Sequence, residues 1–335
     1  MKKKVLIVDN GFKEKKPFLI YSFENNTGIS VKTIYNFHNK RSYNLLEKIF
    51  LKLRQPIDSS GFNKRIIKAV INFKPDIILI IKGNNIFPKT LKIIKSKLKD
   101  VGIHSWTADN MIKKHNSSKY FEDSICLYDS HFTTKSNIVD SLFDLGAKKV
   151  VFLKKAYSKF HHYPEKYDKE YDYNVLFIGS AEKERYDSMK YIANHGISVN
   201  IFGNMWDKNY LSINNLNIHR KALIGESYRK AISSSKISLC FLRKINDDLQ
   251  TSRTMEIPAC RGLMIAERTN EHLELFKEDE EAIFFDSNKE LLDKVIYYLK
   301  NPNLAEKIRN AGYNRAISSG YSFDEMTKTI LKEIN

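Results

Sequence analysis

The residues best suited to do chemistry lie in the stretch TSRTMEIPACRGLMIAE, which begins at residue 251. Its apolar character predicts burial, yet it carries Arg253 and Glu256, one helical turn apart, just ahead of Pro258 and Gly262. An ionised carboxylate accepts hydrogen bonds from two hydroxyls at once, and the dipole at a helix start favours it. A guanidinium suits phosphate groups or a carboxylate partner. Arg253 and Glu256 are therefore candidate binding residues, and the alternative interpretation is a structural ion pair and a solvated glutamate.

Two turns that contain glycine supply a second kind of candidate. In IGSAEKER, Gly179 ends a predicted strand, so the backbone can approach phosphates and the amides of the following helix can attract them. Arg185 adds a cation at the end of the same stretch. Gly203, in IFGNMW, ends the next predicted strand in a similar way. Because a glycine after a strand is common in α/β proteins, each turn alone is a weak signal.

Asp109, in the stretch SWTADN, is the candidate acid of the first half of the chain, because it follows a predicted buried strand. A turn-forming aspartate is the alternative interpretation. The nine histidines show no spacing typical of metal ligands, and the adjacent His161 and His162 lie in a charged segment, so no metal site is predicted. The P-loop and GxGxxG patterns are absent, which disfavours nicotinamide and flavin enzymes.

Two series of alternating strand-like and helix-like segments must position these candidates. The first contains KPDIILIIKGNN (74–85), whose continuous apolar run between turn residues is typical of a strand buried on both faces. The other strands predicted in this half are 4–10, 29–37, 101–110, 124–135 and 147–157, and the predicted helices are 42–54, 62–73, 87–100 and 136–146.

The segment 158–173 is rich in charge and tyrosine, has no apolar periodicity, and is predicted to be a linker. The second series follows it, with strands at 173–180, 197–204, 236–243, 263–268 and 281–287 and helices at 185–196, 225–235, 251–262, 288–301, 302–320 and 322–334. Together the two series predict an α/β protein with two Rossmann-like, doubly wound parallel sheets, over residues 1–160 and 170–335. The last helix is expected to cross back to the first domain. Such sheets bind ligands beyond the carboxyl ends of their strands, so we expect the chemistry in a cleft that the two domains face.

Composition and charge narrow the class of protein. A chain of 335 residues suggests two domains, and no apolar window is long enough to span a membrane. The apolar run after the first lysines is too short for a signal peptide, and the three cysteines are scattered, so we expect a cytoplasmic protein without disulfides. Residues 1–164 hold 31 Lys and Arg against 13 Asp and Glu, whereas the rest is nearly balanced. This excess predicts an anionic partner or surface for the first half, unless it reflects only a preference for lysine.

Several longer segments of the second half carry a family resemblance: NVLFIGSAEKER, VNIFGNMW, TSRTMEIPACRGLMIAER, EAIFFDSNKELLDKVIYYLKNP and AEKIRNAGYNRA. With weaker matches in KPDIILIIKG, HSWTADN and DLGAKKVVFL, the chain resembles the CgeB-like spore-maturation proteins within the group 1 glycosyltransferases. This resemblance implies the GT-B fold and transfer of a sugar from a nucleotide-diphospho-sugar, which is a co-substrate rather than a cofactor. It also implies catalysis without a metal ion.

The resemblance assigns roles to the donor-side candidates. Glu256 matches the glutamate that binds the donor ribose, and Arg253 matches a position suited to the diphosphate or to orienting that glutamate. The family has a second acid eight positions earlier, where this chain has Asp248. Aspartate is shorter than the usual glutamate, and Asp247 beside it is the alternative. The eight-residue spacing resembles that of retaining enzymes.

The remaining roles also follow from the resemblance. Arg185 stands where the family has a lysine on the diphosphate, whereas Ser180 replaces the arginine that usually follows the glycine. Gly179 and Gly203 are expected to line the nucleotide pocket. Asp109 matches the acid of the W-x-x-D pattern and is expected to act in catalysis or to contact the acceptor.

Three functions remain open from the sequence. The first is a glycosyltransferase acting on a glycan, lipid-linked or protein hydroxyl, with peripheral association with an anionic membrane. The second is a GT-B scaffold without turnover that binds in a surface or spore layer. The third, a polyanion or nucleic-acid binder, is disfavoured because no nucleic-acid motif is present.

Overall fold

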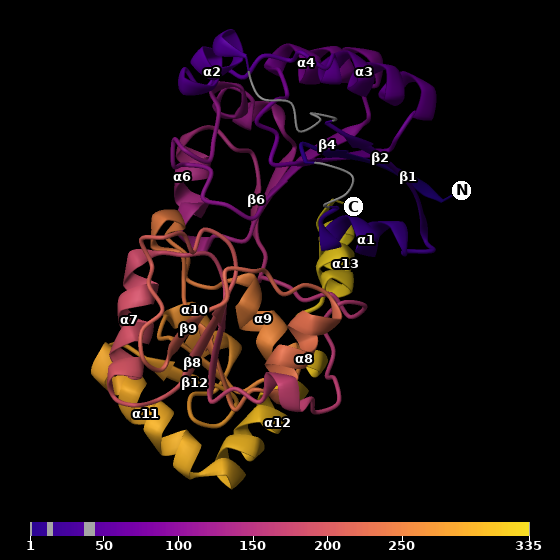
Figure 1. Ribbon diagram of the computed structural model, residues 1–335. Helices are drawn as coiled ribbons and strands as arrows, with labels where there is room; N and C mark the ends of the chain where they lie inside the picture. Colours follow the sequence, from indigo (N-terminus) through magenta and orange to yellow (C-terminus); the bar gives the residue numbers. More distant parts are fainter. Residues whose placement is uncertain (1, 12–15, 37–43, 335) are drawn as a thin grey trace. The chain divides into compact units, whose positions relative to one another are not determined.

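The computed structural model describes residues 2–11, 16–36 and 44–334. The chain forms two compact units, one made of residues 1–154 with 323–335 and the other of residues 155–322 (Figure 1). Each unit contains one six-stranded sheet in which every pairing is parallel. The predicted α/β class with two Rossmann-like sheets is therefore confirmed.

The first sheet has the strand order β2-β1-β3-β4-β5-β6. Its strands are β1 (Lys3–Asp9), β2 (Ile29–Tyr35), β3 (Ile77–Ile81), β4 (Gly102–Thr107), β5 (Ser130–Thr133) and β6 (Val150–Phe152). All five residues of β3 are buried, as the continuous apolar run requires. The predicted strand over residues 124–135 was too long, because its first part forms a 3-10 turn at Ile125–Leu127.

The helices of the first unit pack on its sheet and on one another. They are α1 (Phe18–Glu24), α2 (Leu45–Lys52), α3 (Phe62–Phe73), α4 (Pro88–Lys97), α5 (Lys119–Glu122), α6 (Val139–Asp144) and α13 (Phe323–Ile334). Apolar side chains of α3 and α4 share one core cluster with those of β1, β3 and β4. The hydroxyl of Ser22 on α1 donates to the carbonyl of Phe323 at 3.0 Å, and Thr327 donates to Ser22 at 2.9 Å. These bonds fasten α13 to α1.

The second sheet has the order β12-β11-β10-β7-β8-β9. Its strands are β7 (Val175–Ile178), β8 (Val199–Phe202), β9 (Leu216–Ile218), β10 (Ile237–Cys240), β11 (Met264–Glu267) and β12 (Ile283–Phe285). Its helices are α7 (Lys183–Asn194), α8 (Glu226–Ser234), α9 (Ser252–Ala259), α10 (Asn270–Leu275), α11 (Asn288–Lys300) and α12 (Pro302–Ser318). Alternate residues of the strands pack on opposite clusters, so α7 and α11 cover one face and α8 and α9 the other.

The segment predicted to be a linker packs on the second unit. The amide of Glu165 donates to the hydroxyl of Ser233 at 3.0 Å, and Arg229 forms an ion pair with Glu165 at 2.7 Å. Lys169–Tyr171 forms a 3-10 turn. The division between the two compact units lies at residues 154 and 155, ahead of this segment.

Candidate functional site

The strand order of the second sheet reverses between β7 and β10, which pair with each other. Strands β8 and β9 follow on the β7 side and β11 and β12 on the β10 side, and we call the place between β7 and β10 the switch point. In open parallel sheets a ligand binds at the carboxyl ends of the strands beside such a point. The sequence-predicted residues of this half gather there: Gly179 follows β7, Gly203 follows β8, Asp248 follows β10, and α9 carries Arg253 and Glu256. The candidate donor site is this edge of the second unit.

Glu256 is held by a side chain that the sequence did not single out. The Tyr228 hydroxyl on α8 donates a 2.6 Å hydrogen bond to Oε2 of Glu256. Burial, with the nearby Glu256 charge second, raises the pKa of Tyr228 well above its usual value, so the phenol stays a donor. The Glu256 side chain remains 13% exposed, which leaves its other lone pairs within reach of a ligand.

His162 lies on the other oxygen of the same carboxylate. Its Nε2 is 3.8 Å from Oε1 of Glu256, and its Nδ1 accepts a hydrogen bond from the amide of Ser158 at 3.1 Å. In the neutral ring the proton is therefore on Nε2, facing Glu256. Burial lowers the pKa of His162 despite the opposing effect of Glu256, which favours that neutral ring. The adjacent histidines were visible in the sequence, but nothing in their spacing pointed to Glu256.

Arg253 reaches back to the sheet from the first turn of α9. Its Nε donates to the carbonyl of Ile178, the last residue of β7, and its amide donates to the hydroxyl of Thr251, the helix N-cap. Within the part of the chain that the structure describes, its two terminal nitrogens have no hydrogen-bond or ion-pair partner. The guanidinium is thus anchored by one nitrogen at the switch point, and the other two are available to an anion.

Arg185, the residue predicted to bind the diphosphate, donates hydrogen bonds to backbone carbonyls in this structure. Its side chain is buried, its Nη1 donates to the Ser180 carbonyl at 3.0 Å and its Nη2 donates to the Leu242 carbonyl at 2.8 Å. Those carbonyls belong to the loops after β7 and β10, so Arg185 joins the two sides of the switch point. Burial lowers its pKa, with Glu182 opposing the shift from 3.4 Å away. Arg185 therefore connects the two loops, and its role toward a diphosphate stays a prediction.

The two predicted glycines pack backbone against backbone. A Cβ on Gly203 would lie 2.0 Å from the carbonyl oxygen of Gly179, and the φ of Gly203 is +143°. A Cβ on Gly179 would lie 2.5 Å from the ring of Phe177. The same Gly179 oxygen accepts a 2.8 Å hydrogen bond from the indole nitrogen of Trp206. Both glycines therefore shape the carboxyl edge, and the conformation requires them.

The predicted acids are also engaged by neighbouring groups. Oδ1 of Asp248 accepts from the side-chain amide of Asn246 at 2.7 Å, in a loop where Asp247 has a left-handed φ of +47°. In the first unit, Oδ2 of Asp109 accepts from Lys82 at 2.8 Å. Lys82 follows β3 and Asp109 follows β4, so this pair lies at the carboxyl edge of the first sheet. About a third of the Asp109 side chain is exposed (33%), which leaves it reachable.

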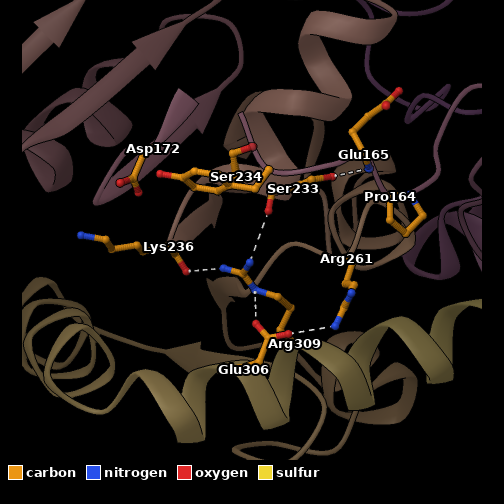
Figure 2. Close-up of a pocket in the computed structure, with 10 residues that line it drawn as sticks. Pro164, Glu165, Asp172, Ser233, Ser234, Lys236, Arg261, Glu306 and Arg309 are labelled. Carbon is orange, nitrogen blue, oxygen red and sulfur yellow. Dashed lines mark hydrogen bonds and ion pairs between the residues drawn. The ribbon is translucent and has the colours of Figure 1, made fainter. Parts of the chain in front are cut away.

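A pocket of about 320 Å³ lies at the opposite, amino edge of the second sheet (Figure 2). Arg309 projects into it and donates to the carbonyls of Ser233 at 3.3 Å and Lys236 at 3.1 Å. Arg261 pairs with Glu306 at 3.0 Å, and Arg309 lies 3.6 Å from the same carboxylate. The two arginines of the pocket are thus paired with oxygens of the protein itself. Because the pocket also lies at the edge of the sheet opposite the switch point, it is not part of the candidate site.

Comparisons with known proteins show what the sequence and the fold are similar to. Residues 185–332 match the sequence model of a family described as glycosyl transferase-like. HepE of Anabaena, solved with UDP, has a TM-score of 0.67 at 9% identity, with 99% of each chain covered. A glycosyltransferase of Rickettsia africae has a TM-score of 0.67 at 13% identity, over 99% of this chain and 98% of that one. No curated protein matches the sequence.

A third solved structure extends the likeness. Sucrose-phosphate synthase of Thermosynechococcus elongatus has a TM-score of 0.67 at 11% identity, over 99% of this chain and 98% of that one. At such low identities the likeness establishes the fold. The chain has the GT-B fold, and the family match covers α9 and most of the switch-point edge.

Proposed function

We propose that this protein is a glycosyltransferase that moves a sugar from a nucleotide-diphospho-sugar to an acceptor hydroxyl. One observation carries the proposal: in a chain with the GT-B fold, the Glu256 carboxylate lies at the switch point of the second sheet and accepts a 2.6 Å hydrogen bond from Tyr228. The glycosyl transferase-like match over residues 185–332 supports it. The finer kinship with CgeB-like spore-maturation proteins remains part of the proposal.

The donor would be held from two directions. The two ribose hydroxyls donate to the free lone pairs of Glu256, and the terminal nitrogens of Arg253 bind the diphosphate. The amides that begin α7, directly after the Gly179 turn, add partial positive charge. The exposed apolar side chains of Met205 and Ile224, on the loops after β8 and β9, offer a surface for the base.

The reaction replaces one bond to the sugar by another. The bond between the anomeric carbon and the diphosphate oxygen breaks, the acceptor hydroxyl oxygen bonds to that carbon, and its proton passes to a base. Arg253 and the α7 amides stabilise the charge on the departing diphosphate, which lets us propose a reaction without a metal ion. Asp248 is the proposed contact to the donor sugar, and its spacing from Glu256 supports a retaining outcome. Asp109 is the proposed acid on the acceptor side.

The donor and acceptor are proposed by class. HepE was solved with UDP and with UDP-glucose, so a uridine diphosphate sugar is the first donor to test. The excess of lysine and arginine in residues 1–164 supports an anionic glycan or a lipid-linked acceptor at an anionic membrane. Among the described residues, no helix has the length and apolar character needed to cross a bilayer. The association that we propose with such a membrane is peripheral.

A scaffold without turnover is the second candidate. Its support is that Arg185 is committed to Ser180 and Leu242, and that Asp248 is shorter than the family's usual acid. This candidate predicts that nucleotide binds and that no glycosylated product forms. A glycosyltransferase predicts nucleotide binding and product formation.

The test combines binding with turnover. Calorimetry with UDP should show binding that Glu256→Gln weakens by about 2–3 kcal/mol, the scale of hydrogen bonds to a charged group. Incubation with a panel of UDP-, GDP- and ADP-sugars should release nucleoside diphosphate from one of them. Binding without release across the panel, with and without glycan acceptors, would favour the scaffold. No nucleotide binding at all would refute both.

A further inference from the structure

Helix α2 and the residues just after it present apolar side chains to solvent. Six of the nineteen exposed large apolar residues among the described positions lie between residues 45 and 57. Four of them form what we call the apolar ridge: Leu45 (75% exposed), Leu46 (62%), Ile49 (43%) and Leu53 (53%). In Figure 1, α2 lies at the margin of the first unit. Such a concentration on one short segment marks an interaction surface rather than scattered exposure.

The helical spacing places the ridge and the charges side by side. Residues four apart on a helix lie one above the other, so Leu45, Ile49 and Leu53 align and Leu46 lies next to them. Lys48 and Lys52 are exposed along the adjoining side. At about 100° per residue they lie within one residue step of the ridge.

The acidic residue of α2 does not offset these lysines at the surface. Glu47 is buried, and its carboxylate accepts from the amide of Asn44 at 2.9 Å while the Asn44 side chain accepts from the amide of Glu47 at 2.8 Å. This capping box uses the acid to begin the helix. The accessible surface of α2 is therefore aliphatic and positively charged.

We propose that α2 is the element that docks this protein on an anionic lipid bilayer. The apolar ridge enters the boundary between headgroups and acyl chains, and Lys48 and Lys52 contact the lipid phosphates. Charge complementarity selects this occupant, because the helix offers cations and no accessible acid, and residues 1–164 carry 31 basic against 13 acidic residues. The inference rests on the peripheral association proposed above and names the surface that achieves it.

The first test compares matched variants of the full-length chain. Leu45→Gln, Leu46→Gln and Ile49→Gln together keep a good helix former at each position while removing most of the ridge. The control is Leu211→Gln with Leu273→Gln, two exposed leucines of the second unit. For charge, Lys48→Gln with Lys52→Gln is compared with Lys89→Gln and Lys92→Gln, two exposed lysines of α4. Circular dichroism verifies that each variant is folded.

Cosedimentation with phosphatidylcholine vesicles, with and without phosphatidylglycerol, measures partition. We expect binding to the anionic vesicles, at least tenfold weaker for the ridge variant and severalfold weaker for the Lys48 and Lys52 variant. The leucine control should match the parent protein, and the α4 pair should lose less than the α2 pair. Equal losses from both lysine pairs, or an unchanged ridge variant, would overturn the proposal.

A reporter tests insertion directly. The two native tryptophans, Trp106 and Trp206, are buried, so Leu46→Trp adds an exposed one. Its emission should shift to the blue on anionic vesicles and be quenched by brominated acyl chains. An unshifted spectrum on bound protein would refute docking through α2. So would a dimer in sedimentation that the ridge variant abolishes while vesicle binding is absent. No nucleotide is present in these measurements, so they can fail or succeed independently of glycosyl transfer.

Discussion

The carbonyl oxygen of Gly179 fills the space that a side chain at Gly203 would need, at 2.0 Å from the position of its Cβ. This contact brings the ends of β7 and β8 together, and Trp206 donates to the same oxygen. The close backbone contact between the two glycines therefore shapes the edge of the sheet where the donor is proposed to bind. The side chains of the candidate site project from this edge.

Gly203→Ala should therefore destabilise the second unit by about 3 kcal/mol or more, because the clash is with backbone that cannot move aside. Gly196→Ala is the control. Gly196 also has a positive φ, +84°, but nothing lies within 4 Å of its Cβ position, so only the backbone cost of about 1–2 kcal/mol applies. Urea unfolding measures both. Equal losses would show that conformation, and not the contact with Gly179, accounts for the effect.

Tyr228→Phe should reduce recognition of the ribose specifically. The variant removes the 2.6 Å hydrogen bond that orients Glu256 and leaves the ring in place. We expect the affinity ratio between UDP and its 2′,3′-dideoxy analogue to fall by about tenfold, or 1.4 kcal/mol. A merely structural role would weaken both ligands alike and leave the ratio intact. Glu256→Gln in the same assay shows whether the ribose contact exists at all.

Arg253 and Arg185 should respond differently to substitution. Arg253→Gln should weaken UDP more than uridine, since only UDP carries the phosphates. Arg185→Gln should instead lower the free energy of unfolding by several kcal/mol, because the carbonyls of Ser180 and Leu242 lose their donors. Calorimetry and urea unfolding separate the two effects. A stable Arg185→Gln protein that binds uridine but not UDP would instead support the predicted diphosphate role of Arg185.

The first unit should lose stability in acid through His104. Burial is the main cause that lowers the pKa of His104 from 6.5 to about 4, and its Nδ1 lies 2.7 Å from the buried Ser130 hydroxyl. Between pH 6.5 and 4 the unfolded chain binds a proton that the folded chain does not. Stability therefore falls as the pH drops through this window, by up to about 3 kcal/mol.

Hydrogen exchange of the β4 amides between pH 7 and 4 measures this dependence on the first unit alone. His104→Asn should flatten the dependence, whereas His195→Asn, at an exposed position, should leave it unchanged. A parent protein whose β4 opening free energy stays constant with pH would refute the assignment.

Many strands and helices could be predicted from the sequence because the patterns that indicate them are local. The burial of β3 and the bounds of α3, Phe62–Phe73, follow from apolar periodicity and flanking turn residues. Helix α1 was not predicted: it has seven residues and no side-chain cap, and contacts with α13 support it. Its partner lies three hundred residues away, so no local pattern could reveal it.

The candidate site divides in the same way. Glu256 and Arg253 could be singled out as candidates because one short block carries both, and the structure places them on α9 at the switch point. Tyr228 and His162 could not be found, because their roles depend on which strands neighbour one another. The direction of the Arg185 side chain depends on the Leu242 carbonyl, which belongs to another loop.

The return of α13 to the first unit has a consequence for how the molecule is made. Residues 323–335 belong to the same compact unit as residues 1–154, with the whole of residues 155–322 translated between them. On the ribosome, every residue of the second unit emerges before residues 323–335, so the α13 side of α1 stays uncovered until the end of synthesis. The unit whose synthesis begins first is thus the unit that is completed last. An expression fragment that ends near residue 154 would lack α13.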